Sequence, residues 1–236
     1  ITTESFSIGV NNLNDNDVIL VDSNTATANT VNENVAVGTT ITGLTIAARD
    51  DDTGATISSY VLVGAADGSG ANTAPFAINA STGVVTVNGA LDFETTESYT
   101  IYVKATATDG SITTESFSIG VNNLNDNDVI LVDSNTATAN TVNENVAVGT
   151  TITGLTIAAR DDDTGATISS YVLVGAADGS GANTAPFAIN ASTGVVTVNG
   201  ALDFETTESY TIFVKATASD GSITTESFSI GVNNLN

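Results

Sequence analysis

The chain has 236 residues, of which 41% are hydrophobic and 13% charged, with 27 Asp and Glu against four Lys and Arg. A chain this apolar is expected to fold, and a formal charge of −23 without a basic patch argues against nucleic acid and anionic membranes as partners. The absence of Cys, His, Met and Trp excludes disulfides and soft metal ligands, so any bound metal must be held by oxygen atoms.

No apolar run approaches the roughly 20 residues that a membrane-spanning helix needs, so we expect no membrane insertion. Ile1 lies inside a repeated segment, and we therefore expect the chain to be a fragment whose targeting signals lie elsewhere. Acidic repeats without cysteine favour an exported bacterial surface protein over an animal ectodomain.

The chain is a tandem duplication, in which residues 1–125 recur as residues 112–236 with two substitutions. This period exceeds the roughly 20 to 50 residues of solenoid repeats and suits whole domains joined in series. The predicted parts are the last strand of a preceding repeat with its linker at residues 1–16, a domain at 17–122, a linker at 123–127 and a second domain at 128–236.

Short apolar segments of period two, separated by turn residues, predict an all-β sandwich. In chain order, strands are expected near residues 44–48, 60–63, 76–78, 84–87, 99–108 and 116–121. A long loop is expected at 64–75 and a tight turn at 79–83.

Two strands give the clearest expectations about which side chains face the core. Alternation predicts that Tyr99, Ile101, Val103, Ala105 and Ala107 face the core and that the intervening residues face solvent. Phe117, Ile119 and Val121 do the same in the strand that leads into the linker. Both substitutions between the copies, Tyr102 to Phe213 and Thr108 to Ser219, fall on the outer face.

Residues 1–10 duplicate the final strand of a repeat without the rest of it. Their apolar side chains, Phe6, Ile8 and Val10, are therefore expected to lack a sheet of their own. We expect this segment either to fray or to pair with an exposed sheet edge of another molecule.

Acidic motifs recur in each repeat at strand ends and in loops. In the first repeat they are Glu33 in VNENV, Asp50 and Asp52 in ARDDD, Asp92 and Glu94 in LDFE, and Asp109 in ATDG, with Asp126 added by the linker. Any one of these motifs, taken singly, is more often structural or merely solvated than functional. The occurrence of all these motifs together, in this order, is stronger evidence for a functional site than any one of them.

Together the motifs resemble those of the cadherin fold, in particular the cadherin-like repeats of large secreted bacterial adhesins of the biofilm surface. The resemblance rests on Glu33-Asn34, Ala48 to Asp52, Leu91 to Glu94, Ala107 to Gly110 and Asn123 to Asn127, which stand in the family's order. It implies tandem Greek-key β-sandwich domains of cadherin-like architecture, arranged in an elongated rod, with Ca²⁺ bound where two domains meet.

The resemblance also implies which residues bind Ca²⁺ at the junction. They are Glu33, Asp92 and Glu94 of the first domain, Asn125, Asp126 and Asn127 of the linker, and Asp161, Asp163 and Asp220 of the second domain. Incomplete sites with weaker occupancy are expected at the ends of the chain, formed by Asn14, Asp15 and Asn16 with Asp50, Asp52 and Asp109, and by Glu144, Asp203 and Glu205.

Charge supports this assignment independently of the resemblance. Two bare carboxylates about 5 Å apart repel by roughly 3 kcal/mol at an effective dielectric constant of about 20, so converging carboxylates need cations. Ca²⁺ accepts six to eight oxygen ligands in flexible geometry and suits Asn and Asp side chains better than Mg²⁺ does. Two departures from the family pattern are Asn123, which lowers the charge of the site, and Asp128, which replaces a frequent Pro.

The sequence therefore predicts a calcium-stiffened extender repeat of a large adhesin, located outside the cell at its surface. The alternative is a directly adhesive domain that binds like domains or cell-surface glycans. Neighbouring repeats of the same chain are the expected partners in either case. Catalysis by paired carboxylates is not expected, because the chain offers no other catalytic group.

Overall fold

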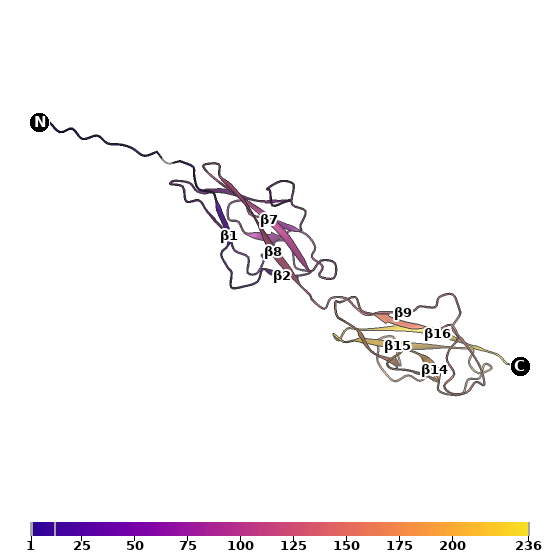
Figure 1. Ribbon diagram of the computed structural model, residues 1–236. Helices are drawn as coiled ribbons and strands as arrows, with labels where there is room; N and C mark the ends of the chain where they lie inside the picture. Colours follow the sequence, from indigo (N-terminus) through magenta and orange to yellow (C-terminus); the bar gives the residue numbers. More distant parts are fainter. Residues whose placement is uncertain (1, 12, 236) are drawn as a thin grey trace. The chain divides into compact units, whose positions relative to one another are not determined.

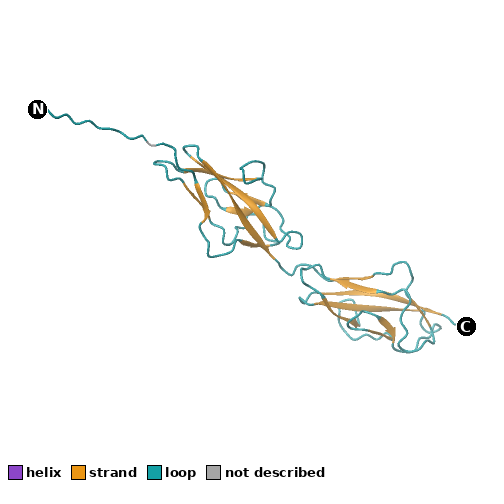
Figure 2. Ribbon diagram, viewed as in Figure 1, coloured by secondary structure: helices purple, strands orange, loops and turns teal. Residues whose placement is uncertain are grey.

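The computed structural model describes residues 2–11 and 13–235, and the expectations that concern Ile1, Asn12 and Asn236 lie outside the described residues. The chain divides into two compact units, Ile1–Leu124 and Asn125–Asn236. All regular secondary structure within the described residues is β-strand, without a helix, which confirms the predicted all-β class (Figure 2). The described part of the chain accordingly has no helix that could span a bilayer.

The described residues of each unit form eight strands. In the first they are β1 (Ile19–Asp22), β2 (Thr30–Asn32), β3 (Ile46–Arg49), β4 (Ile57–Val63), β5 (Phe76–Ile78), β6 (Val85–Val87), β7 (Ser98–Ala107) and β8 (Ile112–Asn122) (Figure 1). The second unit repeats them as β9 (Ile130–Asp133), β10 (Thr141–Asn143), β11 (Ile157–Arg160), β12 (Ile168–Val174), β13 (Phe187–Ile189), β14 (Val196–Val198), β15 (Ser209–Ala218) and β16 (Ile223–Asn233).

The main sheet of the first unit has the strand order β2-β8-β7-β4. Strand β8 pairs antiparallel with β7 and parallel with β2, in the register Thr30 to Gly120 and Asn32 to Asn122. A bulge between Ile57 and Ser59 shifts the register of β4 against β7. In the second unit the equivalent order is β10-β16-β15-β12.

Two further antiparallel pairs, β1 with β3 and β5 with β6, complete the β-sandwich of the first unit, and β9 with β11 and β13 with β14 complete that of the second. A bridge between Thr40 and Thr86 attaches β6 to the segment before β3. Buried residues of both pairs join the same hydrophobic core as those of the main sheet, among them Leu20, Ile46 and Phe76. The core therefore lies between the sheets, as the cadherin-like architecture requires.

The expected faces of the long strands are confirmed. Ile101, Val103 and Ala105 of β7 and Ile119 of β8 are fully buried, while the residues between them are exposed or half-buried. Tyr99 is only partly buried, and its ring meets that of Phe76 edge to face with centroids 5.5 Å apart. Alternation therefore predicts the buried face correctly in the two longest strands of this unit, β7 and β8.

Several strand boundaries differ from those expected. Strand β4 begins at Ile57 rather than near residue 60, and β3 begins at Ile46, so that Leu44 precedes it. Val84 lies outside β6 and is exposed. Strands β1 and β2 were not predicted, because the apolar run at residues 18–21 does not alternate and β2 contains a single apolar residue, Val31.

Residues 2–11 form no strand, in agreement with the expectation that they lack a sheet of their own. The side chains of Phe6, Ile8 and Val10 are exposed. Their counterparts Phe117, Ile119 and Val121 in β8 are buried, because there the same sequence lies between β2 and β7.

Candidate metal centre

Glu33 is the centre of a carboxylate cluster where β2 and β8 end. Its side chain is 1% exposed. One carboxylate oxygen, Oε2, accepts the backbone N–H of Phe93 and the other, Oε1, that of Leu124, both at 2.6 Å. The chain can turn away directly after Glu33 because Asn34 adopts a φ of 56°, which Asn tolerates better than most residues.

Asp92 and Glu94 reach this cluster from the turn that follows the buried Leu91. Asp92 caps the turn by accepting hydrogen bonds from the backbone N–H and the hydroxyl of Thr95, at 3.0 and 2.8 Å. One oxygen each of Glu33, Asp92 and Glu94 lies within 4.8 Å of the others. We call this group the lower cluster.

The second unit has the same lower cluster, formed by Glu144, Asp203 and Glu205. Glu144 accepts the backbone N–H groups of Phe204 at 3.0 Å and Leu235 at 2.7 Å. In addition, Glu205 Oε1 accepts a hydrogen bond of 3.0 Å from the side-chain nitrogen of Asn234.

A second cluster, which we call the upper cluster, gathers Asp50, Asp52 and Asp109, with one oxygen each within 4.8 Å of the others. Asp52 is 6% exposed, and its N–H donates to Asp50 Oδ1 at 2.9 Å. The hydroxyl oxygen of Ser111 lies between the other two carboxylates, 2.6 Å from Asp50 Oδ2 and 2.9 Å from Asp109 Oδ1, so its one proton can be donated to either of them. The second unit repeats this cluster with Asp161, Asp163 and Asp220.

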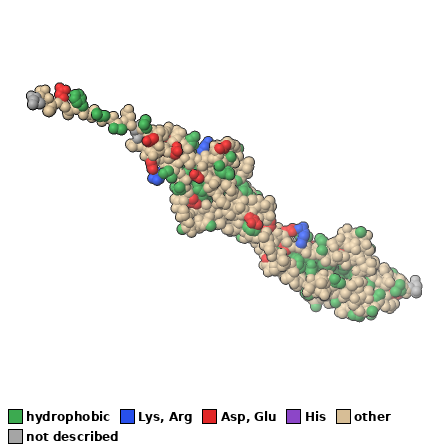
Figure 3. All heavy atoms as spheres, in the orientation of Figure 1, with side chains coloured by type: hydrophobic (Ala, Val, Ile, Leu, Met, Phe, Trp, Pro, Cys, Tyr) green, Lys and Arg blue, Asp and Glu red, His purple; other side chains and the backbone are tan. Residues whose placement is uncertain are grey.

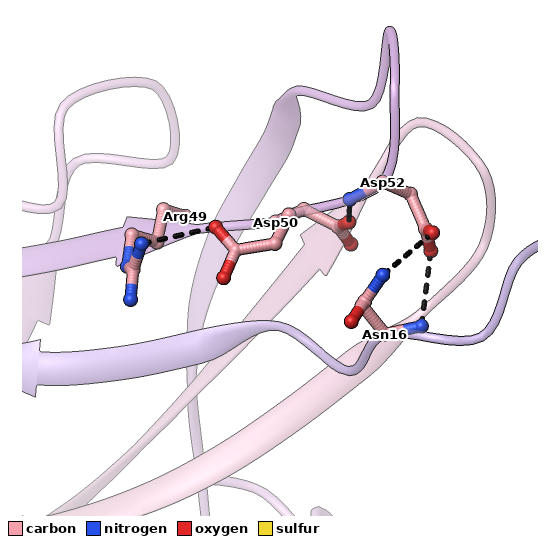
Figure 4. A network of polar contacts seen from close by, with 5 residues as sticks. Asn16, Arg49, Asp50 and Asp52 are labelled. Atoms are coloured by element: carbon pink, nitrogen blue, oxygen red, sulfur yellow. Dashed lines mark hydrogen bonds and ion pairs between the residues drawn. The ribbon is translucent and has the colours of Figure 1, made fainter.

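Asparagines of the preceding linker form hydrogen bonds with each upper cluster. Asn16 donates to the Asp52 carboxylate twice, from its backbone at 3.2 Å and from its side chain at 2.9 Å (Figure 4). Asn14 reaches the carbonyl of Asp109 at 3.3 Å, and Asp15 accepts from Asn16 at 3.3 Å.

The second unit repeats these linker contacts. Asn127 donates to Asp163 at 3.2 and 3.0 Å, and the backbone N–H of Asp126 donates to Asp163 at 3.4 Å. Asn125 reaches the carbonyl of Asp220 at 3.3 Å. The structure therefore brings the predicted residues together within each unit, in a lower and an upper cluster. That the lower cluster of one unit and the upper cluster of the next share ions stays a prediction.

The two arginines found in ion pairs contact aspartates that lie outside the clusters. Arg49 pairs with Asp51, the middle residue of the acidic triplet, at 3.0 Å, and Arg160 pairs with Asp162 in the same way. Both pairs are largely exposed. Figure 3 shows how few basic side chains lie on the visible face. Asp51 and Asp162 therefore form ion pairs, whereas Asp50, Asp52 and their counterparts belong to the carboxylate clusters.

Hydrogen bonding keeps several cluster carboxylates ionised. The side-chain hydrogen bond from Asn16 holds the pKa of Asp52 below its usual range. Burial raises the pKa of Asp163, but hydrogen bonds from Asn127 and Asp126 outweigh it, so that the pKa is lowered overall. The backbone N–H of Leu235, followed by that of Phe204, lowers the pKa of Glu144.

These lowered pKa values predict a loss of stability in acid. A carboxylate whose pKa is lower in the folded state stabilises the fold above its unfolded-state pKa of about 4, and this contribution disappears as the pH falls through the folded-state value. Metal-free protein should therefore show a melting temperature that falls between about pH 5 and 3. The fall should be smaller in Asp52→Asn than in Asp51→Asn, and equal slopes in the two variants would refute this origin.

Sequence reasoning missed the groups that hold the carboxylates in place. These are the backbone N–H groups of Phe93 and Leu124, and the hydroxyl of Ser111 with its counterpart Ser222, which can donate to Asp161 or Asp220. Of these groups, only the Ser111 hydroxyl could have been suspected from the sequence, because Ser111 directly follows the Asp-Gly pair of its turn. Backbone donors have no signature in sequence because every non-proline residue has one.

The donor set fits a hard divalent cation. Carboxylate and amide oxygens are the ligands that Ca²⁺ prefers, and each cluster places three like charges within 4.8 Å. At an effective dielectric constant of about 20, each such pair repels by roughly 3 kcal/mol. A bound cation would remove that repulsion, so the chemistry of these residues is compatible with calcium.

The chain resembles known proteins over most of its length. The model of the cadherin domain matches residues 28–122 and 139–233. Protocadherin Fat 4 of Mus musculus is 35% identical over 192 residues, which are 79% of this chain but 4% of that protein. Cadherin-23 of the same species is 31% identical over 185 residues, which are 78% of this chain and 5% of that protein.

Solved structures give the same result. The extracellular domain of protocadherin GammaB4 aligns with a TM-score of 0.70 and 25% identity over 96% of this chain and 34% of that one. Domains EC22-24 of mouse Cadherin-23 align with a TM-score of 0.68 and 25% identity over 95% of this chain and 67% of that one. The named relatives are animal proteins of which this chain spans a small part, and its predicted bacterial origin stays a prediction.

Proposed function

Because the chain belongs to the cadherin domain family, we propose that it is an extender segment of a cell-surface adhesin, stiffened by Ca²⁺ at the junction of residues 123–127. The observation that carries this proposal is the pair of clusters in each unit, each of which places one buried carboxylate within 4.8 Å of two others that are half-buried or exposed. A protein that only needed solubility would spread these charges over its surface.

In the proposed site, each unit would supply part of the ligands. Glu33, Asp92 and Glu94 are held at the carboxyl end of the first unit, and Asp161, Asp163 and Asp220 are held next to the linker in the second. Asn125, Asp126 and Asn127 would add linker oxygens between them. When bound, calcium supplies positive charge to which all three segments are attracted at once, and this attraction would limit bending of the linker.

The proposed location is outside the cell, where cadherin ectodomains lie. A bacterial surface or biofilm adhesin is the setting that the cysteine-free, acidic sequence favours. Neighbouring repeats are the proposed partners, with like domains or surface glycans as further ones. We propose no catalytic role for the carboxylates.

Removal of calcium tests the proposal. In millimolar Ca²⁺, small-angle scattering should report a stiff two-unit particle, and excess chelator should shorten its maximum dimension, broaden its distance distribution and lower its melting temperature. Asp163→Asn should abolish most of this response because Asp163 lies within the upper cluster. Asp162→Asn is the matched control, since the Asp162 carboxylate pairs with Arg160 and does not belong to the cluster.

A scattering profile and melting curve that ignore calcium in the wild-type chain would contradict the extender proposal. Sedimentation in the same buffers addresses direct adhesion, which predicts calcium-dependent association between chains. A monomer at every concentration would count against adhesion between like domains.

A further inference from the structure

Each unit carries one Asn-Gly pair, Asn88-Gly89 in the first and Asn199-Gly200 in the second. Asn88 is exposed and directly follows β6, and its backbone N–H donates to the carbonyl of Pro75 at 2.9 Å. The glycine has a packing role, because a Cβ at residue 89 would lie 3.0 Å from the Cβ of Pro75. Asn-Gly pairs most often only mark a turn, and this packing explains the glycine without any reaction.

The surroundings of the pair nevertheless leave its reacting groups accessible. Within the described part of the chain, the side chain of Asn88 makes no hydrogen bond and the N–H of Gly89 has no acceptor. Gly89 also has no Cβ that could keep the Asn88 side chain away from its nitrogen. Asn79, in the turn between β5 and β6, differs in both respects. Its side-chain oxygen accepts the N–H groups of Ser81 and Thr82, each at 3.0 Å, and an alanine follows it.

We propose that Asn88 and Asn199 are sites of spontaneous conversion to aspartate and isoaspartate in the folded chain. The backbone nitrogen of Gly89 gives up its proton to water and bonds to Cγ of Asn88. The bond from Cγ to Nδ2 then breaks, and ammonia leaves after taking up a proton from water. A water molecule opens the resulting cyclic imide, giving aspartate when it attacks the side-chain carbonyl and isoaspartate when it attacks the main-chain carbonyl. The reaction consumes only water and does not depend on calcium.

Isoaspartate disturbs the fold more than aspartate, because its backbone is one carbon longer. Asn88 is fixed by its hydrogen bond to Pro75, and shortly after it Leu91 is 3% exposed and accepts the N–H of Asn34 at 3.4 Å. An extra backbone carbon between these two fixed points must bulge outward or displace Leu91 from the core. Isoaspartate at residue 88 should therefore lower the melting temperature of the first unit, whereas aspartate at this exposed position adds only a charge.

Incubation of the full chain in chelator, at neutral and at mildly alkaline pH, tests the proposal. The intact mass should rise by one amide-to-acid exchange for each unit. The initial rate should rise severalfold with the pH, because the attacking nitrogen must lose its proton. Fragmentation of the tryptic peptide that follows Arg49 and ends at Lys104 should place the change at Asn88 and distinguish aspartate from isoaspartate. The melting temperature should fall as the isoaspartate fraction grows.

Asn79 lies in the same tryptic peptide and is the internal control, which should remain an amide while Asn88 is converted. A chain with Asn88→Gln and Asn199→Gln should fold like the wild type and gain no mass, because a longer side chain must close a larger ring and reacts far more slowly. Equal conversion at Asn79 and Asn88 would overturn the proposal. So would an Asn88 that stays an amide in the folded chain after the urea-unfolded chain has reacted.

Discussion

Replacing Glu33 with alanine should destabilise the first unit by roughly 1–3 kcal/mol, because two partly buried backbone N–H groups lose their acceptor at about 0.5–1.5 kcal/mol each. These groups belong to Phe93 and Leu124, which both donate to the Glu33 carboxylate at 2.6 Å. Denaturant titration should show a single transition splitting into two, since the second unit keeps its own Glu144.

Glu33→Gln separates the two roles of this side chain. Glutamine keeps one acceptor oxygen and the shape of the side chain, so in metal-free buffer it should lose about half as much stability as alanine. In calcium the two variants should be similarly impaired, because both lack the charge that a cation requires. Equal stability of Glu33→Ala and wild type in chelator would show that the two backbone contacts are not needed.

Replacing Gly43 with alanine should destabilise the first unit by about 2–5 kcal/mol, through a positive φ and a steric clash together. Gly43 has a φ of +86°, and a Cβ there would lie 2.3 Å from the carbonyl oxygen of Ala28. Relief requires movement of the backbone next to β2, because no flexible side chain is involved. Thermal unfolding followed by circular dichroism would measure the loss.

Gly38→Ala is the control for the conformational part of this effect. Gly38 has a similar φ of +95°, but a Cβ there would meet nothing within 4 Å. It should therefore cost only the roughly 1–2 kcal/mol of a left-handed residue. If Gly38→Ala and Gly43→Ala lost the same stability, the close approach of Ala28 would not matter.

The sequence predicted the parts of the fold that are encoded locally. Alternation located β7 and β8 and assigned Ile101, Val103 and Ile119 to the core, because ten or more residues give the pattern room to repeat. It did not find β2, whose three residues become a strand only by pairing with the end of β8. Val31 is the single apolar residue of β2, so this strand has no alternation by which it could be recognised.

The candidate site, too, could be predicted only in part. The resemblance to cadherin repeats placed Asp50, Asp52 and Asp109 in one group, and the structure brings their oxygens within 4.8 Å. It could not show that Asp51, between two cluster members, pairs with Arg49 instead. That distinction depends on which way successive side chains point after β3 ends.

The parallel pairing of β2 with β8 bears on mechanical load. Strand β2 lies near the amino end of its unit and β8 at the carboxyl end, and their register runs in one direction from Thr30 to Asn32. A pull on the two ends of a unit draws such strands past each other along their axes, so the hydrogen bonds between them are sheared together rather than opened one after another. Force transmitted along a chain of these repeats would meet its resistance at this strand pair, and Glu33, which directly follows β2, anchors Leu124 just beyond β8.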